Sequence, residues 1–329
     1  MMETNIEKVI KRNSGVDISV IIPNYNGIKY LDECFCSLRG QSFKDFEVIL
    51  VDDGSTDDSV EFVQKNYPWI RVVTHAVNRG FSASVNDGIK AARGKFITLL
   101  NNDTVVDKKW LTNLYNAARR SPEAGFFASK MYFYGEDKLI NAAGDAMGVN
   151  GQGWNIGYNE RDNEKYFFPK KVFGACAGAA MYRREMLDEI GLFDEDFTII
   201  YEDADLSFRA QLMGFECVFV PDAVVYHLQF GTLGSLSKIK TFYSSTNSLN
   251  LIIKNMPLKL FIEYFYEIYK RQILQIEELS SSKELLKIAI KGKLKSLKLL
   301  PKMLKKRVKI QRDKKISNEY LEKLLLSEY

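Results

Sequence analysis

The sequence lacks any uninterrupted apolar run of about 18 residues, the length that a membrane-spanning helix needs. Residues 1–14 are polar, so we expect no secretory signal peptide. The four cysteines, Cys34, Cys36, Cys176 and Cys217, form no Cys-x-x-Cys pair, which argues against a zinc or redox site. We therefore expect reduced, mostly buried thiols in a cytoplasmic protein.

Two common phosphate-binding patterns are also missing. No Gly-x-Gly-x-x-Gly follows the first predicted strand, and no Gly-x-x-x-x-Gly-Lys-Ser/Thr occurs. The sequence therefore supports neither a dinucleotide fingerprint nor a P-loop. If the protein binds a diphosphate, we expect a divalent cation to balance its charge.

The net charge of +4 conceals an uneven distribution. Residues 283–315 contain 14 lysines and arginines and only two acids, Glu284 and Asp313, which gives this segment a charge of +12. The rest of the chain is therefore at −8. A basic tail on an acidic body predicts an acidic partner for the tail.

The first hundred residues alternate between β-rich and helical patterns. Apolar runs that end at turn residues predict strands over 18–22, 46–51, 69–74 and 96–100. Leu31, Cys34, Phe35 and Leu38 recur at helical spacing, and 82–92 is the third helical segment between these strands. This order predicts an α/β fold with a mainly parallel, doubly wound sheet.

Polar residues follow each of these strands, namely Asn24, Asp53, Asn78 and Asp103. Because parallel strands end along one edge of such a sheet, we expect these side chains to converge where open α/β sheets bind ligands. For Asp53 or Asp103 taken alone, the alternative interpretation is an aspartate in an ordinary surface turn. The carboxylate of Asp103 is a hard oxygen ligand that suits Mg²⁺ or Mn²⁺.

The second half is less regular, and it contains an acidic cluster. We expect a long, functional or mobile loop over 144–168 and a helix that begins near Glu202 and Asp203. Asp205 and Arg209 lie four residues apart, so we expect them to pair on the surface of this helix.

Two separate strand segments, 216–220 and 223–226, are predicted on either side of Pro221. His227 follows the second segment and comes after two acidic sites, so it is a candidate metal ligand. His75, the other histidine, has no such neighbours and is expected to be structural.

Taken in order, several short motifs make the chain resemble the inverting family 2 glycosyltransferases, which adopt the GT-A fold. The resemblance extends from about residue 18 to about residue 230. Its motifs are Val20-Ile-Ile-Pro-Asn-Tyr-Asn26, Val51-Asp-Asp-Gly-Ser-Thr-Asp57, Asn78-Arg-Gly-Phe81, Leu100-Asn-Asn-Asp-Thr104, Arg183-Arg-Glu185, Phe193-Asp-Glu195 and Glu202-Asp-Ala-Asp-Leu206.

The resemblance implies a role for each matching residue. Asp203 corresponds to the catalytic base, and Asp103 to the last acid of the metal motif, with His227 completing the metal site. Asn101 stands where the family has the first acid of that motif, so one carboxylate is missing. The residues implied in donor binding are Pro23, Asn24, Tyr25, Asp53, Arg79, Asn101, Asn102 and Asp103, and those implied in metal binding are Asp103, His227 and Asn101.

By the same resemblance, the protein would transfer a sugar from a nucleotide diphosphate donor to an acceptor hydroxyl, with Mg²⁺ or Mn²⁺. The motifs look most like bacterial rhamnosyltransferases that use dTDP-rhamnose to build surface polysaccharide. A Gln-x-x-Arg-Trp motif is absent, which favours single addition over processive synthesis. The alternatives are a nucleotidyltransferase and a non-catalytic relative that binds sugar nucleotides.

We expect three regions: a lead-in over 1–17, a GT-A catalytic domain over 18–255 and a helical basic region over 256–329. Leucines among the lysines of 283–315 predict a basic amphipathic helix on the inner face of the membrane, near a saccharide or polyprenyl-linked acceptor. An oligomerising or solvated helix is the alternative. No nucleic-acid-binding motif is present, so nucleic acid is not an expected partner.

Overall fold

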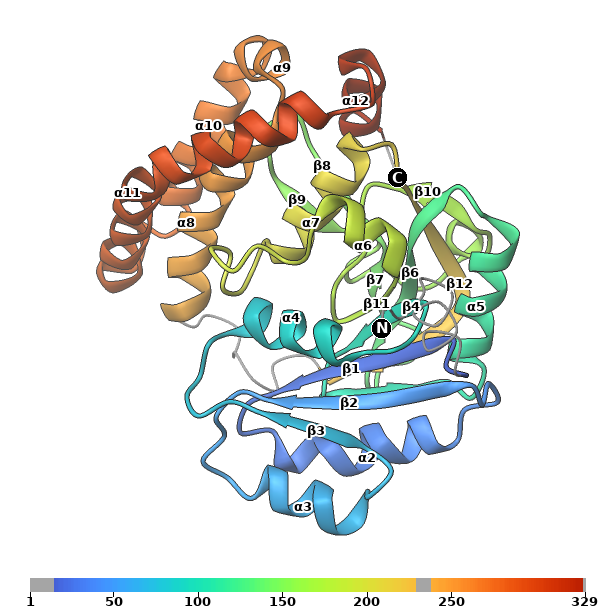
Figure 1. Ribbon diagram of the computed structural model, residues 1–329. Helices are drawn as coiled ribbons and strands as arrows, with labels where there is room; N and C mark the ends of the chain where they lie inside the picture. The colour runs from blue at the N-terminus through green and yellow to red at the C-terminus, as the bar shows by residue number, and fades with distance from the viewer. Residues whose placement is uncertain (1–14, 229–237, 328–329) are drawn as a thin grey trace, which may run out of the picture.

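One mixed β-sheet lies at the centre of an α/β fold (Figure 1). The computed structural model describes residues 15–228 and 238–327. Within these residues, ten strands form this sheet in the order β10-β12-β6-β11-β4-β1-β2-β3, with β5 beside β12 and β7 beside β6. These strands are β1 Ile18–Asn24, β2 Phe46–Asp52, β3 Arg71–Thr74, β4 Phe96–Leu100, β5 Thr104–Val106, β6 Ala124–Phe133, β7 Ile140–Ala143, β10 Lys170–Val172, β11 Ala179–Arg183 and β12 Glu216–His227.

The half of the sheet formed by β3, β2, β1 and β4 is parallel and is covered on both faces. Val20 and Ile22 of β1 share a core with Leu31 and Phe35, while Ile21 between them packs in a second core with α4. Alternate residues therefore face opposite layers, as the period of a strand requires. The covering helices are α2 Ile28–Arg39 and α3 Ser59–Asn66 on one face and α4 Phe81–Ala91 on the other (Figure 1).

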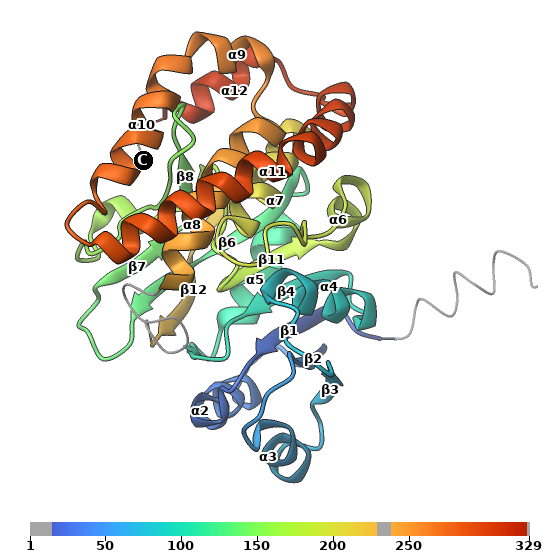
Figure 2. The same ribbon diagram turned by 90° about the vertical axis from the view of Figure 1, so that its left-hand side faces the viewer.

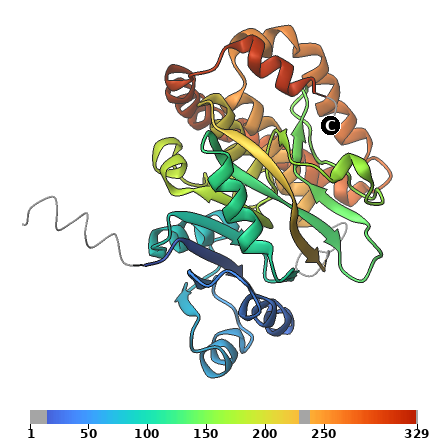
Figure 3. The ribbon, with the colours of Figure 1, turned by 90° about the vertical axis from the view of Figure 1, so that its right-hand side faces the viewer.

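The other half of the sheet is mixed, because β11 runs antiparallel to both β4 and β6. Figure 3 shows α5 (Trp110–Arg120) lying over β6 and β12 on the outer face. The expected break at Pro221 is wrong: β12 is one strand from Glu216 to His227. A bulge between Val220 and Val224 shifts its register against β6, and this bulge accommodates a proline that cannot donate to the ladder.

The expected loop over 144–168 contains short regular elements. The hairpin strands β8 (Asp145–Met147) and β9 (Gly153–Asn155) pair with each other, and the 3₁₀ helix η1 (Glu164–Tyr166) follows. Two further helices, α6 (Arg184–Ile190) and α7 (Glu202–Leu212), precede β12.

A layer of helices follows β12 and packs on α7 (Figure 2). Phe208 and Leu212 of α7 share a core with Leu251, Ile252 and Met303 of this layer. The long helix α11 lies against α8, and Thr246 donates to the carbonyl of Gly292 at 3.1 Å. The helices of this layer are α8 Lys238–Asn255, α9 Leu258–Glu263, α10 Phe265–Glu277, α11 Lys283–Asp313 and α12 Asn318–Leu325.

None of the helices in the described ranges is both long and apolar enough to cross a membrane. The predicted boundary between 255 and 256 stays a prediction. It would separate α8 from α11, although these two helices pack against each other.

Candidate active site

The carboxyl ends of β1, β2 and β4 are joined by side-chain hydrogen bonds. Asn24, which is only 2% exposed, donates through Nδ2 to Asp52 Oδ1 at 2.9 Å. The Oδ1 atom of Asn24 accepts a hydrogen bond from Asn102 Nδ2 at 2.7 Å. Asp52 also accepts from the amide of Ser55 at 3.0 Å, which closes the turn after β2. These bonds bring three predicted strand ends to one edge of the sheet.

Asp53 lies at the same edge, and its carboxylate already accepts several hydrogen bonds. The amides of Arg79 and Gly80 donate to its two oxygens, each at 2.8 Å. His75 Nδ1 lies 2.7 Å from Asp53 Oδ1, and His75 Nε2 lies 3.2 Å from Asp87 Oδ2. His75 therefore fixes the carboxylate of Asp53, which the resemblance places among the donor-binding residues. One feature of the sequence could have indicated this contact: His75 directly follows β3 and Asp53 directly follows β2, and these two strands are neighbours in the sheet.

The loop after β3 also contacts the segment between α6 and α7. Gly80 has φ +89, and a Cβ added there would lie 2.3 Å from Thr198 Cγ2. Glycine is therefore required at this position by both conformation and space. The Arg79 guanidinium donates to Asp87 at 2.6 Å and lies 3.8 Å from Glu195. Its side chain is 41% exposed, so it sits at the rim of the site.

Two of the residues predicted to bind the sugar donor lie at this edge of the sheet: Pro23 is in β1, and Tyr25 directly follows that strand. Pro23 is half-buried and stands opposite Val51 of β2 in the sheet register. Tyr25 is 40% exposed, which leaves its ring free to meet a ligand. Aromatic rings at such positions commonly stack on bases or sugars.

The predicted metal residues Asp103 and His227 are neighbours. His227 Nε2 lies 3.3 Å from Asp103 Oδ1, and the amide of Leu228 donates to the Asp103 carbonyl at 2.9 Å. His227 Nδ1 is 3.1 Å from Asn141 Oδ1. With Nδ1 as the donor in that bond, Nε2 keeps the lone pair that a metal ligand needs.

This donor set fits a hard divalent cation that is completed by a phosphate-bearing ligand. No cluster of three or more acids, histidines or cysteines that could hold a metal occurs in the described part of the chain. Mg²⁺ sites often use only one or two carboxylates together with substrate phosphates and water. The carboxylate of Asp103 and the imidazole of His227 fit a site of this kind.

Asp203 lies in the first turn of α7. Its Oδ1 accepts from the amide of Ala204 at 2.7 Å, and its Oδ2 accepts from the amide of Ala177 at 3.3 Å. Burial raises the pKa of Asp203 above its ordinary value, although these amide bonds oppose the shift. The neighbouring Glu202 is 7% exposed, and burial together with the charge of Asp203 raises its pKa well above the usual range.

Segment 176–178 hydrogen-bonds both to Asp203 and to Asn101, the first residue of the predicted metal motif. Ala177 donates to Asp203, and the carbonyl of Gly178 accepts from the amide of Asn101 at 2.9 Å. A Cβ added to Gly178 would lie 3.1 Å from Asn101 Nδ2. Asp203 and Asn101 therefore both contact the same short backbone segment, and the small residues there permit this approach.

Two residues just before Asp203 have unusual backbone conformations. Ile200 has φ 65 and Tyr201 has φ 72, the left-handed region that residues other than glycine rarely adopt. Asn247 of α8 is fully buried and donates through Nδ2 to the carbonyls of Ile199, at 3.1 Å, and Ile200, at 2.7 Å. The helical layer thus holds the turn that leads to Asp203. Strained backbone of this kind is concentrated at functional sites.

Residues 19–191, more than half of the chain, match the family described as "Glycosyl transferase family 2". The chain belongs to glycosyl transferase family 2. Among curated proteins it is 28% identical to "Uncharacterized protein y4gI" of Sinorhizobium fredii, over 66% of this chain and 25% of that protein. It is 38% identical to "Glycosyltransferase GlyG" of Streptococcus pneumoniae, over 36% of this chain and 40% of that protein. The chain thus spans less than half the length of these two relatives.

The fold matches a solved structure of S. aureus TarS residues 1–349 in complex with UDP, with a TM-score of 0.54 and 18% identity over 91% of this chain and 89% of that one. The predicted α/β fold of the family 2 type is therefore confirmed. Members of family 2 typically use a divalent cation, which agrees with the Asp103 and His227 donor set.

In α7 of this family 2 chain the expected pairing of Asp205 with Arg209 is confirmed, but its expected position on the surface is wrong. Asp205 is 0% exposed, and besides Arg209 at 2.9 Å it accepts from Lys254 Nζ at 2.7 Å. Lys254 also donates to Asp194 at 2.6 Å. Asp194 in turn accepts from Lys306 of α11 at 2.5 Å. Asp205 and Arg209 therefore belong to a buried ion-pair network between α7 and the helical layer.

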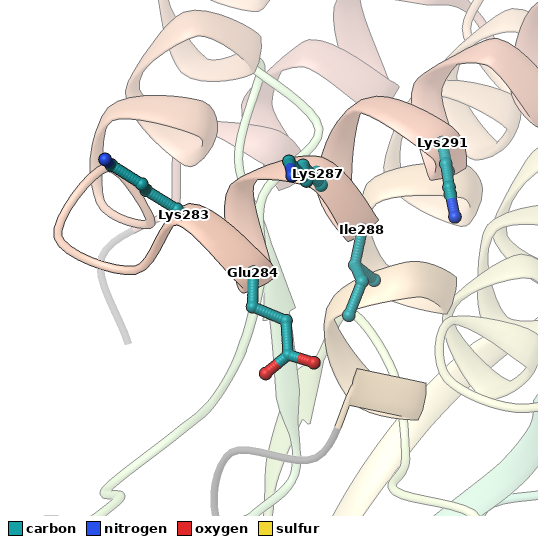
Figure 4. A pocket seen from close by; sticks show the side chains of 5 residues that line it. All are labelled: Lys283, Glu284, Lys287, Ile288 and Lys291. Carbon is teal, nitrogen blue, oxygen red and sulfur yellow. The ribbon is translucent and has the colours of Figure 1, made fainter.

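A surface hollow elsewhere in the molecule is separate from this family 2 site. It is lined by Lys283, Glu284, Lys287, Ile288 and Lys291, all on the first turns of α11 (Figure 4).

Proposed function

We propose that this family 2 chain transfers a sugar from a nucleoside diphosphate sugar to an acceptor hydroxyl, with inversion at the anomeric carbon. The observation that supports this most strongly is that Asp203 and Asn101 both hydrogen-bond to segment 176–178. Asn101 begins the turn after β4 that bears Asp103, and Asp103 contacts His227 at the end of β12, so segment 176–178 links a carboxylate with a raised pKa to these two residues. A UDP complex of a relative with the same fold supports the donor class.

In the proposed reaction the acceptor oxygen attacks the anomeric carbon of the donor sugar. The new C–O bond forms as the bond to the diphosphate oxygen breaks, and its electron pair leaves with the nucleoside diphosphate. Asp203 accepts the proton of the acceptor hydroxyl. Because burial raises its pKa, Asp203 is a stronger base than an exposed aspartate and can share the proton more evenly with the hydroxyl.

Asp103 and His227, with Asn101, would hold the divalent cation. When bound, the cation supplies positive charge beside the departing diphosphate. Asp53 and Tyr25 would bind the nucleoside, with His75 holding the Asp53 carboxylate in place. Asn24 and Asn102 would shape this pocket through their mutual hydrogen bond. Arg79 at the rim would meet the diphosphate or the sugar.

We propose dTDP-rhamnose as the donor and a saccharide or polyprenyl-linked chain of a surface polysaccharide as the acceptor. The support for rhamnose is the resemblance of the motifs Leu100-Asn-Asn-Asp-Thr104, Phe193-Asp-Glu195 and Glu202-Asp-Ala-Asp-Leu206 to bacterial rhamnosyltransferases. A panel of nucleotide sugars, each incubated with Mn²⁺, tests this choice by thermal shift and by release of the nucleoside diphosphate. Stabilisation by UDP-hexoses but not by dTDP-rhamnose would refute it.

The base is tested by Asp203→Asn, which keeps the shape of the side chain but cannot accept the proton. We expect turnover to fall about 10²–10⁴-fold, with nucleotide affinity unchanged by calorimetry. Asp222→Asn, an exposed acid on β12, is the matched control and should keep full turnover. If Asp203→Asn turns over like the control, the proposed reaction is wrong.

A further inference from the structure

Helix α11 exposes a row of apolar side chains on its outer side. Ile290 is 45% exposed, Leu294 54%, Leu297 56%, Leu304 46% and Val308 70%. At the helical repeat these positions fall within an arc of about 80°. The opposite side of the helix is buried and holds Ala289, Gly292, Ser296 and Met303. The exposed row is therefore an apolar face without a partner in the described residues, here called the outer row.

A line of lysines flanks the outer row. Lys287, Lys291, Lys298, Lys305 and Lys309 are all exposed, and each is turned by roughly 60–100° from the centre of the outer row. None of them forms an ion pair within residues 15–228 or 238–327. By contrast, Lys302 and Lys306, which are turned further inward, are paired with Asp196 and Asp194. The basic charge of α11 is thus divided between internal pairs and an unpaired outer line.

The hollow at the start of α11 has the same character. Lys283, Lys287 and Lys291 surround it, together with Glu284 and Ile288 (Figure 4). Glu284 is neutralised by Lys238 at 2.5 Å. The excess charge of this end of the helix is therefore positive, and it lies next to apolar surface.

We propose that the outer row of α11 and its flanking lysines bind the surface of an anionic lipid bilayer, with the helix lying in the plane of the interface. A large exposed apolar patch is costly for a free protein, and burial among acyl chains would remove it from water. The lysine line would then meet negatively charged headgroups. A second copy of the helix fits less well, because it would bring two unpaired lysine lines together.

This proposal assigns membrane contact to the outer side of α11 alone, and not to the whole basic stretch 283–315 that the sequence indicated. Within the basic stretch 283–315, Lys302, Lys306 and Lys315 are paired with acids of the α/β body, so an external partner would meet the outer line and the lysines of the hollow instead. Membrane binding on this face would leave those internal pairs, and the core beneath them, undisturbed.

The test is sedimentation of the full chain with vesicles of phosphatidylcholine that contain about a third phosphatidylglycerol. The key variant changes Lys287, Lys291, Lys298 and Lys305 to Gln. Its control changes Lys44, Lys65, Lys108 and Lys109, four exposed and unpaired lysines of the α/β body, to Gln and so has the same net charge. A third variant, Leu294→Gln with Leu297→Gln, removes apolar contact only.

We expect the wild type and the control to pellet with these vesicles, and affinity to fall roughly 600-fold in the key variant, at about fivefold for each of the four lysines. The leucine variant should also lose binding, and raised salt should weaken the wild type. The proposal is overturned if the wild type stays in the supernatant, if it pellets equally with pure phosphatidylcholine, or if the control loses as much binding as the key variant. A dimer by light scattering that the leucine variant dissociates would identify a second copy as the occupant instead. None of these readouts depends on sugar transfer.

Discussion

The contact between Asn247 and the turn before Asp203 allows a quantitative prediction. Two left-handed residues, Ile200 and Tyr201, cost about 1–2 kcal/mol each. The two hydrogen bonds from Asn247 offset about 0.5–1.5 kcal/mol each. The two quantities are of similar size, so Asn247→Ala, which deletes about 1–3 kcal/mol, should let the turn relax and move Asp203.

The assay is steady-state transfer with the free energy of unfolding measured in parallel. We expect kcat to fall about 10–100-fold, because small displacements of a reacting group cost that much. The KM for the donor should stay within about threefold, since Asp53 and Asn24 are held by contacts that do not involve α8. Asn250→Ala is the matched control: this residue is also buried on α8, but it accepts from Ser296 at 2.7 Å.

The control should lose similar stability with kcat near that of the wild type. A second change, Ile200→Gly in the Asn247→Ala background, should restore much of the kcat, because glycine adopts a positive φ without steric cost. The reasoning is refuted if Asn247→Ala and Asn250→Ala have the same kcat. It is also refuted if the added glycine lowers kcat further.

Three other predictions follow from buried charges. Lys254→Met leaves Asp194 and Asp205 buried without their shared cation, so urea unfolding should show a loss of about 3–5 kcal/mol, and adding Asp205→Asn should recover part of it. In the pH dependence of kcat, the acid limb should lie above pH 3.8, the ordinary pKa of aspartate. The reason is that burial raises the pKa of Asp203, and its protonated form cannot accept a proton. An acid limb at or below pH 3.8 would contradict this. Burial lowers the pKa of Lys293 to about 8. Between about pH 8 and 10 the unfolded chain therefore binds a proton that the folded chain does not, so the free energy of unfolding should rise with pH over this range. Chemical unfolding of the Lys293→Met variant should lack this rise.

The parallel half of the fold could be predicted because its information is local. Each strand from β1 to β4 is an apolar run that ends in turn-forming polar residues, and the order of strands and helices requires those ends to meet. The hydrogen bonds from Asn24 to Asp52 and Asn102 are the outcome of that rule. The position of Asp203 relative to these residues could not be derived this way and came from the resemblance alone.

What the sequence did not reveal depends on contacts between distant segments. The spacing of Asp205 and Arg209 indicates a pair but not its surroundings, and the pair is buried only because Lys254 and Asn255, about fifty residues later, cover it. Pro221 interrupts the pattern of β12, yet the partner strand β6 tolerates it through a bulge. His75 was expected to be structural because it has no acidic neighbours like those of His227; the pairing of β2 with β3 is what brings its partner Asp53 to it.

The close approach of Gly80 to Thr198 has a consequence for engineering the donor specificity. Residues 78–80 and the chain just before Asp203 are in steric contact, so neither can be redesigned alone. A bulkier residue at 80, introduced to accept a different nucleotide, would push on the segment that leads to Asp203, the proposed base, and we expect it to be detected first as slower turnover. Libraries aimed at this loop should therefore keep Gly80, which its φ of +89 requires, and should treat Thr198 as part of the same site.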